Sequence, residues 1–165
     1  MISVRKALSG DESGIYELLG QVLAVHNAAR PDLFCPSGSK YTRQELTDIF
    51  NDEKRPVFVA VDSHGKIIGH EFCILEDHNG PGDTPHRTLY IDDLCIDEDH
   101  RGQHIGRLLY EYASEYAIQQ NCYNITLHVW EGNDNAKAFY DSLGMKPYMT
   151  GMESILMPSM TAADT

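Results

Sequence analysis

The sequence predicts an α/β (α+β) fold, with a mixed, mostly antiparallel sheet of six to seven strands and helices on both faces. Its 165 residues suit a single domain with a substantial core. Short apolar segments alternate with amphipathic segments of helical period. Because no repeat, low-complexity tract or linker divides the chain, we expect one domain over residues 1–158 and a frayed tail over residues 159–165.

The first quarter of the chain predicts a strand and two helices. Residues 2–8 form a short apolar strand, and apolar residues then recur at helical spacing until Pro31, which disfavours a helical residue before it. Residues 30–39 are rich in proline and glycine and indicate a loop. Thr42 and Glu45 form a T-x-x-E capping box, so a second helix begins there.

The middle of the chain predicts three strands in series. Residues 56–61 are apolar, and the turn at residues 63–66 leads into the next strand at residues 67–75. Residues 77–86 are polar and rich in glycine and proline, which indicates an exposed connection. Residues 87–96 form the next strand. Strands joined by hairpins run antiparallel.

The last third predicts a crossover unit followed by one more helix. A helix over residues 107–120 joins the preceding strand to a strand over residues 123–130, and such a connection makes the two strands parallel. Residues 133–143 form a helix that ends at Gly144. We expect residues 145–157 to hold one bent or two short strands.

Composition argues against several classes of function. The formal charge of −12 opposes binding to nucleic acid, although an acidic surface favours cationic substrates as well as plain solubility. No apolar run is long enough for a membrane span, and the first residues do not resemble a signal peptide. The cysteines lack paired spacing, which fits reduced thiols in a cytoplasm better than disulfides or zinc. Two of them, Cys73 and Cys95, lie in apolar strands as buried, inert thiols.

One turn has the chemistry of a phosphate site. It lies between a strand and a helix and reads Arg101, Gly102, Gln103, His104, Ile105, Gly106 and Arg107. The first turn of a helix leaves backbone N–H groups unpaired, and these bind phosphate. The two glycines permit close approach and the two arginines add positive charge. An ordinary strand-to-helix turn has the same composition, so the neighbouring motifs decide.

Those motifs resemble the GNAT superfamily of N-acetyltransferases. The turn is similar to the family's pyrophosphate loop, Gln/Arg-x-x-Gly-x-Gly/Ala, with Arg101 at its first position and Gly106 at its last. His104 replaces the first glycine. A second match is similar to the family's N-x-x-A-x-x-x-Y-x-x-x-G helix and comprises Asn133, Ala136, Tyr140 and Gly144. With Asp92 and Asp93, the pattern looks like the polyamine (spermidine/spermine-type) acetyltransferases.

The resemblance implies an acetyl-CoA-dependent enzyme that acetylates a small or polycationic primary amine by direct attack in a ternary complex. It also implies a homodimer. The CoA-binding residues would be the turn, the pantetheine strand and the later helix, that is Leu94, Cys95, Ile96, residues 101–107, Asn133, Ala136 and Tyr140. No metal ligands are expected.

Tyr140 is the candidate general acid, because acyl transfer from a thioester releases a thiolate that a phenol can protonate. A capped core tyrosine is the alternative. Asp92 is the candidate base or amine anchor, and the alternative is an ion pair with Arg87. Alternation along the strand places Asp92 and Asp93 on opposite faces, unless a bulge re-aims the strand.

Other candidates for the acceptor side are Asp93, His26, Phe34, His128 and Glu131; each has a solvated or structural alternative. His104 is expected to cost about 1 kcal/mol if its position needs a positive φ. A non-catalytic acyl-CoA-binding module on the same fold is the competing hypothesis. A Rossmann dehydrogenase ranks below both, because the chain lacks a full GxGxxG after its first strand. Polyamines, peptide N-termini, lysine side chains, aminoglycosides and amino acids all remain open as acceptors.

Overall fold

The computed structural model describes residues 1–157, so the expected tail over residues 159–165 lies outside the described residues. Its sheet has five strands in the order β1-β2-β3-β4-β5. The strands are β1 (Ser3–Lys6), β2 (Val57–Val61), β3 (Ile67–His78), β4 (His86–Ile96) and β5 (Asn124–Leu127). Neighbours from β1 to β4 are antiparallel, and β5 is parallel to β4. The mixed sheet and parallel crossover are confirmed, whereas the expected count of six to seven strands is wrong for residues 1–157.

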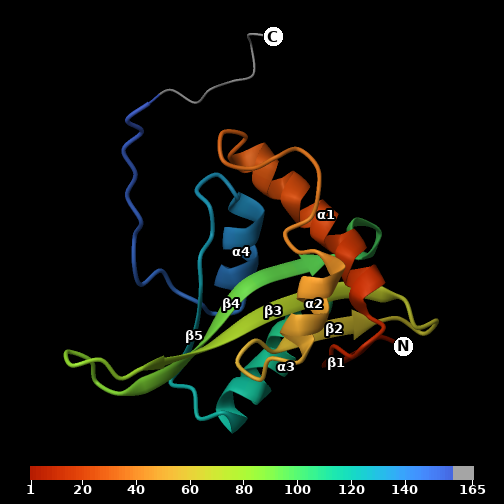
Figure 1. Ribbon diagram of the computed structural model, residues 1–165, viewed down its shortest axis with the longest axis horizontal. Coiled ribbons are helices and arrows are strands. Elements are labelled where there is room, and N and C mark those ends of the chain that lie inside the picture. The colour runs from red at the N-terminus through yellow and green to blue at the C-terminus, as the bar shows by residue number, and fades with distance from the viewer. Residues whose placement is uncertain (158–165) are drawn as a thin grey trace.

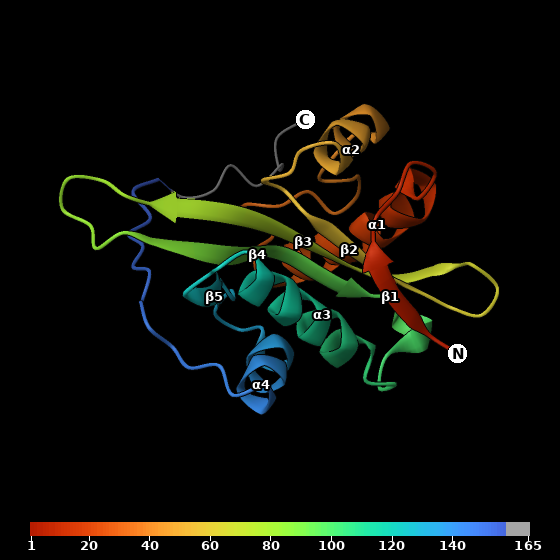
Figure 2. The ribbon, with the colours of Figure 1, turned by 90° about the horizontal axis from the view of Figure 1, so that it is seen from below.

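Helices cover both faces of the sheet, as the sequence predicts (Figures 1 and 2). One face carries α1 and α2, and the other carries α3, with α4 beside it. A short 3-10 turn over Glu98–His100 precedes α3. The helices are α1 (Glu12–Ala29), α2 (Arg43–Phe50), α3 (Ile105–Gln119) and α4 (Asp134–Ser142). The predicted capping box of α2 is present, with both Thr42–Glu45 hydrogen bonds formed.

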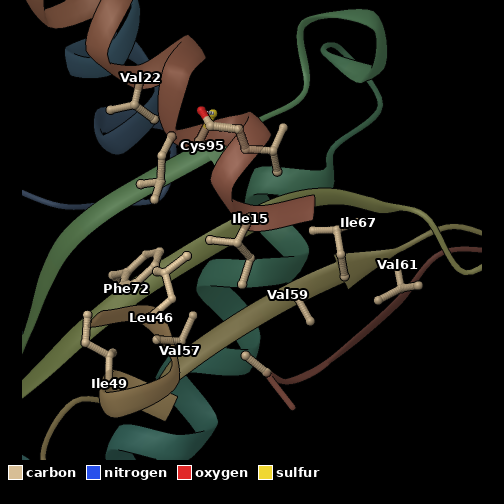
Figure 3. Packing of buried hydrophobic residues seen from close by; sticks show 13 residues of the cluster. Ile15, Val22, Leu46, Ile49, Val57, Val59, Val61, Ile67, Phe72 and Cys95 are labelled. Carbon is tan, nitrogen blue, oxygen red and sulfur yellow. Dashed lines mark hydrogen bonds between the residues drawn. The ribbon is translucent and has the colours of Figure 1, made fainter. Parts of the chain in front are cut away.

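The core consists of two apolar layers that share the central strands. In the first layer, Ile15 and Leu46 pack against Val57 and Val59 (Figure 3). In the second, α3 packs against the opposite face, including Phe58. Successive side chains of β2 therefore enter alternate layers, which explains why its sequence is continuously apolar. Each large apolar side chain buried in this way stabilises the fold by about 1.5–3 kcal/mol.

A bulge in β4 changes the direction of its side chains. The register pairs Phe72 with Asp93 and Cys73 with Ile91, which leaves Asp92 as an extra residue. Ile91 consequently packs in the layer under α3, and Cys95 packs in the layer under α1. Simple alternation would have placed these two residues on the same face.

Beyond the bulge, β4 and β5 separate. Their parallel pairing ends at Ile91 and Leu127, whereas β4 continues to Ile96 alongside β3. The strand expected over residues 123–130 is therefore shorter, and β5 stops at Leu127. Along residues 92–96, the backbone N–H and C=O groups on one edge of β4 are therefore not paired with β5.

Residues 145–157 contain no strand, so the expectation of one bent or two short strands is wrong. The segment leaves the end of α4 and runs away from the body of the domain (Figure 1). A strand is defined by its pairing, and this segment does not return to the edge of β5 in the described chain.

Cys73 and Cys95 are buried, as expected. Burial raises the pKa of the Cys95 thiol to about 12, which keeps it protonated and unreactive. Within residues 1–157, no group of three or more His, Cys, Asp or Glu side chains is arranged to hold a metal ion. No helix in this part of the chain has the length and apolar character to span a membrane.

Candidate active site

The turn before α3 has the backbone of an anion-binding loop. Gly102 and His104 both adopt left-handed conformations, with φ of 77° and 62°, so the condition under which His104 carries a conformational cost is met. His104 is the N-cap of α3, but its side chain makes no capping hydrogen bond. The N–H groups of the first turn are therefore not occupied by a side-chain cap. They lie at the positive end of the helix dipole and can donate to an anionic ligand.

Three residues of this turn have structural roles. A Cβ at Gly106 would lie 2.9 Å from the ring of Phe139, so this glycine permits α3 and α4 to pack closely. Arg107 donates from Nη2 to the carbonyl oxygen of Ser142 at 3.2 Å, which also joins α3 to α4. Ile105 is buried in the core. The turn therefore also fixes the position of α4, the helix that carries Tyr140.

The open edge of β4 follows directly on the bulge. Leu94 and Ile96 pack their side chains toward the layer under α3, and Cys95 packs toward the layer under α1. Their side chains are thus occupied by packing, and what they offer a ligand is backbone N–H and C=O groups. Arg101 donates from Nε to the carbonyl oxygen of Ile96 at 3.4 Å, which links this edge to the turn.

Tyr140 lies on α4 and is partly buried. Burial, together with the charges of Glu71 and Asp93, raises the pKa of its phenol well above the ordinary value. The phenol is therefore protonated at neutral pH, the state that a proton donor requires. Asn133 caps the helix by accepting a hydrogen bond from the N–H of Ala136 at 3.2 Å, so its side chain is used locally.

Asp92 and Asp93 both project toward the face covered by α1 and α2. Asp92 Oδ2 accepts from Lys40 Nζ at 2.6 Å and from the Tyr41 hydroxyl at 3.2 Å. Asp93 Oδ2 lies 3.1 Å from His70 Nε2. Both partners belong to this face, because a row of aromatic contacts runs from Tyr41 through Phe72 to His70. The expectation of opposite faces is therefore wrong, and the bulge is the reason.

The two carboxylates differ in access. The Asp92 side chain is 21% exposed and the Asp93 side chain 6%. The alternative partner, Arg87, binds Asp77 at 2.6 Å instead. Asp92 is thus the more accessible of the two carboxylates, whereas Asp93 is held inside the protein by His70.

Sequence reasoning missed four residues of this region: Lys40, Tyr41, His70 and Glu71. Burial alone would lower the pKa of Lys40, but the hydrogen bond to Asp92 and the negative charges nearby together outweigh it, and the pKa is raised. Glu71 is fully buried on β3, and neither of its carboxyl oxygens has a hydrogen-bond partner in the described chain. Burial raises the pKa of Glu71 to about 8. A charged residue inside an apolar strand was the available signal for Glu71.

The far side of the region is an aromatic cluster. His26 at the end of α1 contacts Phe34, with ring centroids 5.0 Å apart, and Phe34 contacts Trp130 at 5.6 Å. His128 Nδ1 lies 3.1 Å from the Tyr90 hydroxyl. Glu131 is not part of this group, because its side chain is 93% exposed and paired with Lys137. Two of the predicted acceptor-side residues, His26 and Phe34, are thus brought together.

Comparison with known proteins places this geometry in a family. A family profile described as the acetyltransferase (GNAT) family matches residues 22–145. The peptidyl-lysine N-acetyltransferase YjaB of Salmonella typhimurium is 31% identical over 115 residues, which cover 68% of this chain and 66% of that protein. The matched segment thus spans slightly less than two thirds of that relative. A thialysine N-epsilon-acetyltransferase of Bos taurus is 31% identical over 35% of this chain and 34% of its own.

Solved structures share the fold. The crystal structure of a mutant BH1408 protein from Bacillus halodurans superposes with a TM-score of 0.89 and 34% identity, over 94% of this chain and 99% of that one. Glucosamine-6-phosphate N-acetyltransferase from Arabidopsis thaliana superposes with a TM-score of 0.71 at 21% identity, over 95% and 99% of the two chains. The first match is close enough in sequence and coverage to indicate kinship, and the second shows the fold alone. The family resemblance seen in the sequence is confirmed, and this chain belongs to the GNAT family of acetyltransferases.

Proposed function

We propose that this protein transfers the acetyl group of acetyl-CoA to a primary amine, by direct attack of the amine in a ternary complex. The observation that carries the proposal is the Lys40 ammonium, which Asp92 binds at 2.6 Å at the start of the open β4 edge. The Asp92 carboxylate, which we assign to binding the acceptor, thus already binds one primary amine, the Lys40 side chain.

The residues present fit CoA. The uncapped first turn of α3, with Gly102 and His104 in left-handed conformations, would bind the pyrophosphate through backbone N–H groups. The unpaired edge at residues 94–96 would bind the pantetheine arm in the manner of an added strand. When bound, acetyl-CoA supplies an activated acetyl group and a thiolate leaving group.

The protein's own residues would manage two protons. Asp92 would anchor the acceptor ammonium and take its proton, directly or through a water, so that the amine nitrogen is free to attack. Tyr140 would donate its phenolic proton toward the leaving sulfur. The transfer forms one N–C bond and breaks one C–S bond. The nitrogen loses its second proton after the attack, and that proton restores the Tyr140 phenol directly or through solvent. Asp93, fixed by His70, would add a negative field beside both groups.

The acceptor that we propose is a lysine-type primary amine. The relatives named as peptidyl-lysine and thialysine acetyltransferases support this class, and Lys40 shows that a lysine ammonium fits against Asp92. The acceptor would displace Lys40 from Asp92. Polycationic amines form the second group to test. The scattered free thiols are in keeping with a cytoplasmic enzyme, and we propose a homodimer.

The test follows free-thiol release from acetyl-CoA with a lysine peptide, thialysine and spermidine, and checks each product for an added acetyl group by mass spectrometry. We expect turnover with at least one of these amines. Lys40→Met should lower the KM for the amine several-fold, because the acceptor no longer competes with Lys40, while Lys54→Met is the exposed control. Saturable CoA binding without turnover for any amine would support the non-catalytic module instead.

A further inference from the structure

Lys40 places a primary amine of the protein itself on the carboxylate that we assign to the acceptor. It lies in the loop between α1 and α2, and its Nζ is 2.6 Å from Asp92 Oδ2. Asp92 is the extra residue of the β4 bulge, and it directly precedes the open edge that would bind the pantetheine arm. The chemistry proposed for an external amine therefore applies to Lys40 as well.

The structure around the loop holds the Lys40 amine in this place. The ring of Tyr41 stacks on Phe72 with centroids 5.6 Å apart, and its hydroxyl donates to the same Asp92 oxygen at 3.2 Å. Arg55 Nη2 donates to that hydroxyl, also at 3.2 Å. Lys40 Nζ lies 5.4 Å from the centroid of the Tyr41 ring, where an aromatic face attracts a cation. Tyr41 thus fixes the loop, and the amine is held at Asp92 before any substrate binds.

The Lys40–Asp92 pair also borders solvent. The Lys40 side chain is 40% exposed and the Asp92 side chain 21%, so a lysine that has lost its charge is free to turn away. Lys66 forms a similar ion pair, with Asp97 at 2.9 Å. Asp97, however, follows Ile96, where β4 ends, and it is not one of the carboxylates of the bulge. Lys66 is therefore a matched control for Lys40.

The charge of Asp93 acts on both Lys40 and the proposed proton donor. Burial is the largest cause of the raised pKa of Tyr140, and the charges of Glu71 and Asp93 raise it further. For Lys40, burial lowers the pKa, and the hydrogen bond to Asp92 together with the charges of Asp92, Tyr41 and Asp93 raises it. The Lys40 ammonium and the Tyr140 phenol thus lie near the same carboxylate.

We infer that the active site acetylates Lys40 of its own chain, and that this modification frees Asp92 for an external amine. The inference rests on the proposed function and adds an internal substrate to it. Asp92 takes one proton from the ammonium and passes it to solvent, and the free nitrogen attacks the acetyl carbonyl carbon. The new N–C bond replaces the C–S bond, and Tyr140 protonates the departing thiolate. The second proton of the nitrogen then restores the phenol.

The modification changes the state of the acceptor end. Acetyl-lysine is a neutral amide, so it no longer forms an ion pair with Asp92. An external amine then reaches the carboxylate without displacing a charged partner, and hydrogen bonds to charged groups are the stronger ones. The unmodified protein is thus restrained by its own lysine, and its first acetyl group removes the restraint.

The test incubates the full chain with acetyl-CoA and no added amine. Thiol release, intact mass and peptide mapping follow the reaction. We expect one acetyl group per chain, added to Lys40 about 100-fold faster than to Lys66, because the Lys40 amine is already positioned. The half-time should not depend on protein concentration. Lys40→Arg keeps the positive charge and should lose the thiol burst, whereas Lys66→Arg should behave as the wild type.

Mixing two variants distinguishes transfer within a chain from transfer between chains. Tyr140→Phe keeps Lys40 but lacks the proposed proton donor, and Lys40→Arg keeps the donor. In a mixture with acetyl-CoA, Lys40 of Tyr140→Phe should be acetylated no faster than when that variant is alone. The proteins are mapped before the reaction, because Lys40 acetylated during expression in the wild type but not in Tyr140→Phe is the same result. Wild type incubated first with acetyl-CoA should show a several-fold lower KM for a lysine peptide.

Three results would overturn the inference. The first is turnover of an external amine with Lys40 unmodified, and this result leaves the proposed function intact. The second is equal rates at Lys40 and Lys66, or an unchanged Lys40 rate in heat-unfolded protein, either of which shows plain chemical acetylation. The third is acetylation of Tyr140→Phe by Lys40→Arg, which shows transfer between chains. Absence of thiol release both with and without an amine would instead contradict the proposed function, and the inference would fall with it.

Discussion

The proposed cofactor end and the proposed acceptor end of the site are built in different ways. The cofactor end consists of consecutive backbone, in the turn at residues 101–107 and the open edge of β4. The acceptor end consists of side chains brought together from separate parts of the chain: Lys40 and Asp92 are 52 residues apart, and His70 and Asp93 are 23 apart. A backbone site depends on local conformation and tolerates a change of side chain. A side-chain site depends on the whole fold, so acceptor specificity can change while cofactor binding is preserved.

The largest effect is expected where the two ends meet. Tyr140→Phe removes the proposed proton donor and keeps the ring that contacts Phe139, so kcat should fall by about 10²–10⁴-fold. CoA affinity should remain unchanged, because the backbone of the turn is untouched. Thiol release and calorimetry of CoA binding measure the two quantities. Tyr123→Phe, at an 80% exposed position, is the control, and an unchanged kcat for Tyr140→Phe removes the role.

The next effect concerns the stability of the fold and its dependence on the buried Glu71 of β3. Glu71 has a folded pKa of about 8 against an ordinary 4.5, so the folded state binds more protons between these values. The contribution of Glu71 to the free energy of unfolding is therefore fully present below pH 4.5 and is lost as the pH rises toward 8. By pH 7 the loss amounts to about 3 kcal/mol. Glu71→Gln should raise the thermal midpoint at pH 7–8 and flatten the pH dependence.

Glu76→Gln is the matched control on the same strand, since Glu76 is 42% exposed. Thermal unfolding at pH 5 and pH 8 distinguishes the two variants. Equal pH dependence of unfolding in wild type and Glu71→Gln would show that Glu71 is not held neutral by burial.

A smaller, more specific effect is expected at the acceptor end. Asp92→Asn removes the charge that binds the ammonium, and a hydrogen bond to a charged group contributes about 1.5–3 kcal/mol. We therefore expect kcat/KM for the amine to fall by about 10–100-fold, with the affinity for CoA unchanged. Asp77→Asn, which also breaks an ion pair with an arginine, controls for lost surface charge. Loss of CoA affinity in Asp92→Asn would contradict the separation of the two ends.

The smallest effect is expected in the turn. His104→Gly relieves a left-handed φ of 62°, which costs a non-glycine residue about 1 kcal/mol. CoA affinity should be kept or improved, and the thermal midpoint of unfolding should rise slightly. Gly102→Ala, at a φ of 77°, should lower both the CoA affinity and the thermal midpoint. A large loss of affinity in His104→Gly, measured by calorimetry, would show that the imidazole itself binds the cofactor.

The same contrast explains what the sequence predicts. Two of the confirmed predictions, the capping box at Thr42 and the hairpin at residues 63–66, depend on a few neighbouring residues. The parallel crossover follows from the order strand, helix, strand along the chain. The pairing of Lys40 with Asp92 does not depend on neighbouring residues alone, since it needs α2, the loop before it and the bulge to form together. The bulge adds one residue to β4. Asp92 and Asp93 therefore lie on the same face of the sheet, whereas simple alternation would place them on opposite faces.

Residues 145–157 show a second limit. Their apolar residues predict one bent or two short strands, but the segment pairs with no strand of the sheet in the described chain. Pairing depends on the direction in which the chain leaves α4, and the residues of the segment do not determine that direction.

We propose that acetyl-CoA and a primary amine meet between Tyr140 and Asp92. A crystal structure of the protein with CoA and a lysine peptide tests it most directly. We predict the CoA sulfur within hydrogen-bonding distance of the Tyr140 hydroxyl, and the peptide amine at Asp92 with Lys40 displaced. CoA bound away from the α3 turn and the open β4 edge, or a peptide amine bound elsewhere while the Lys40–Asp92 pair stays intact, would contradict the claim.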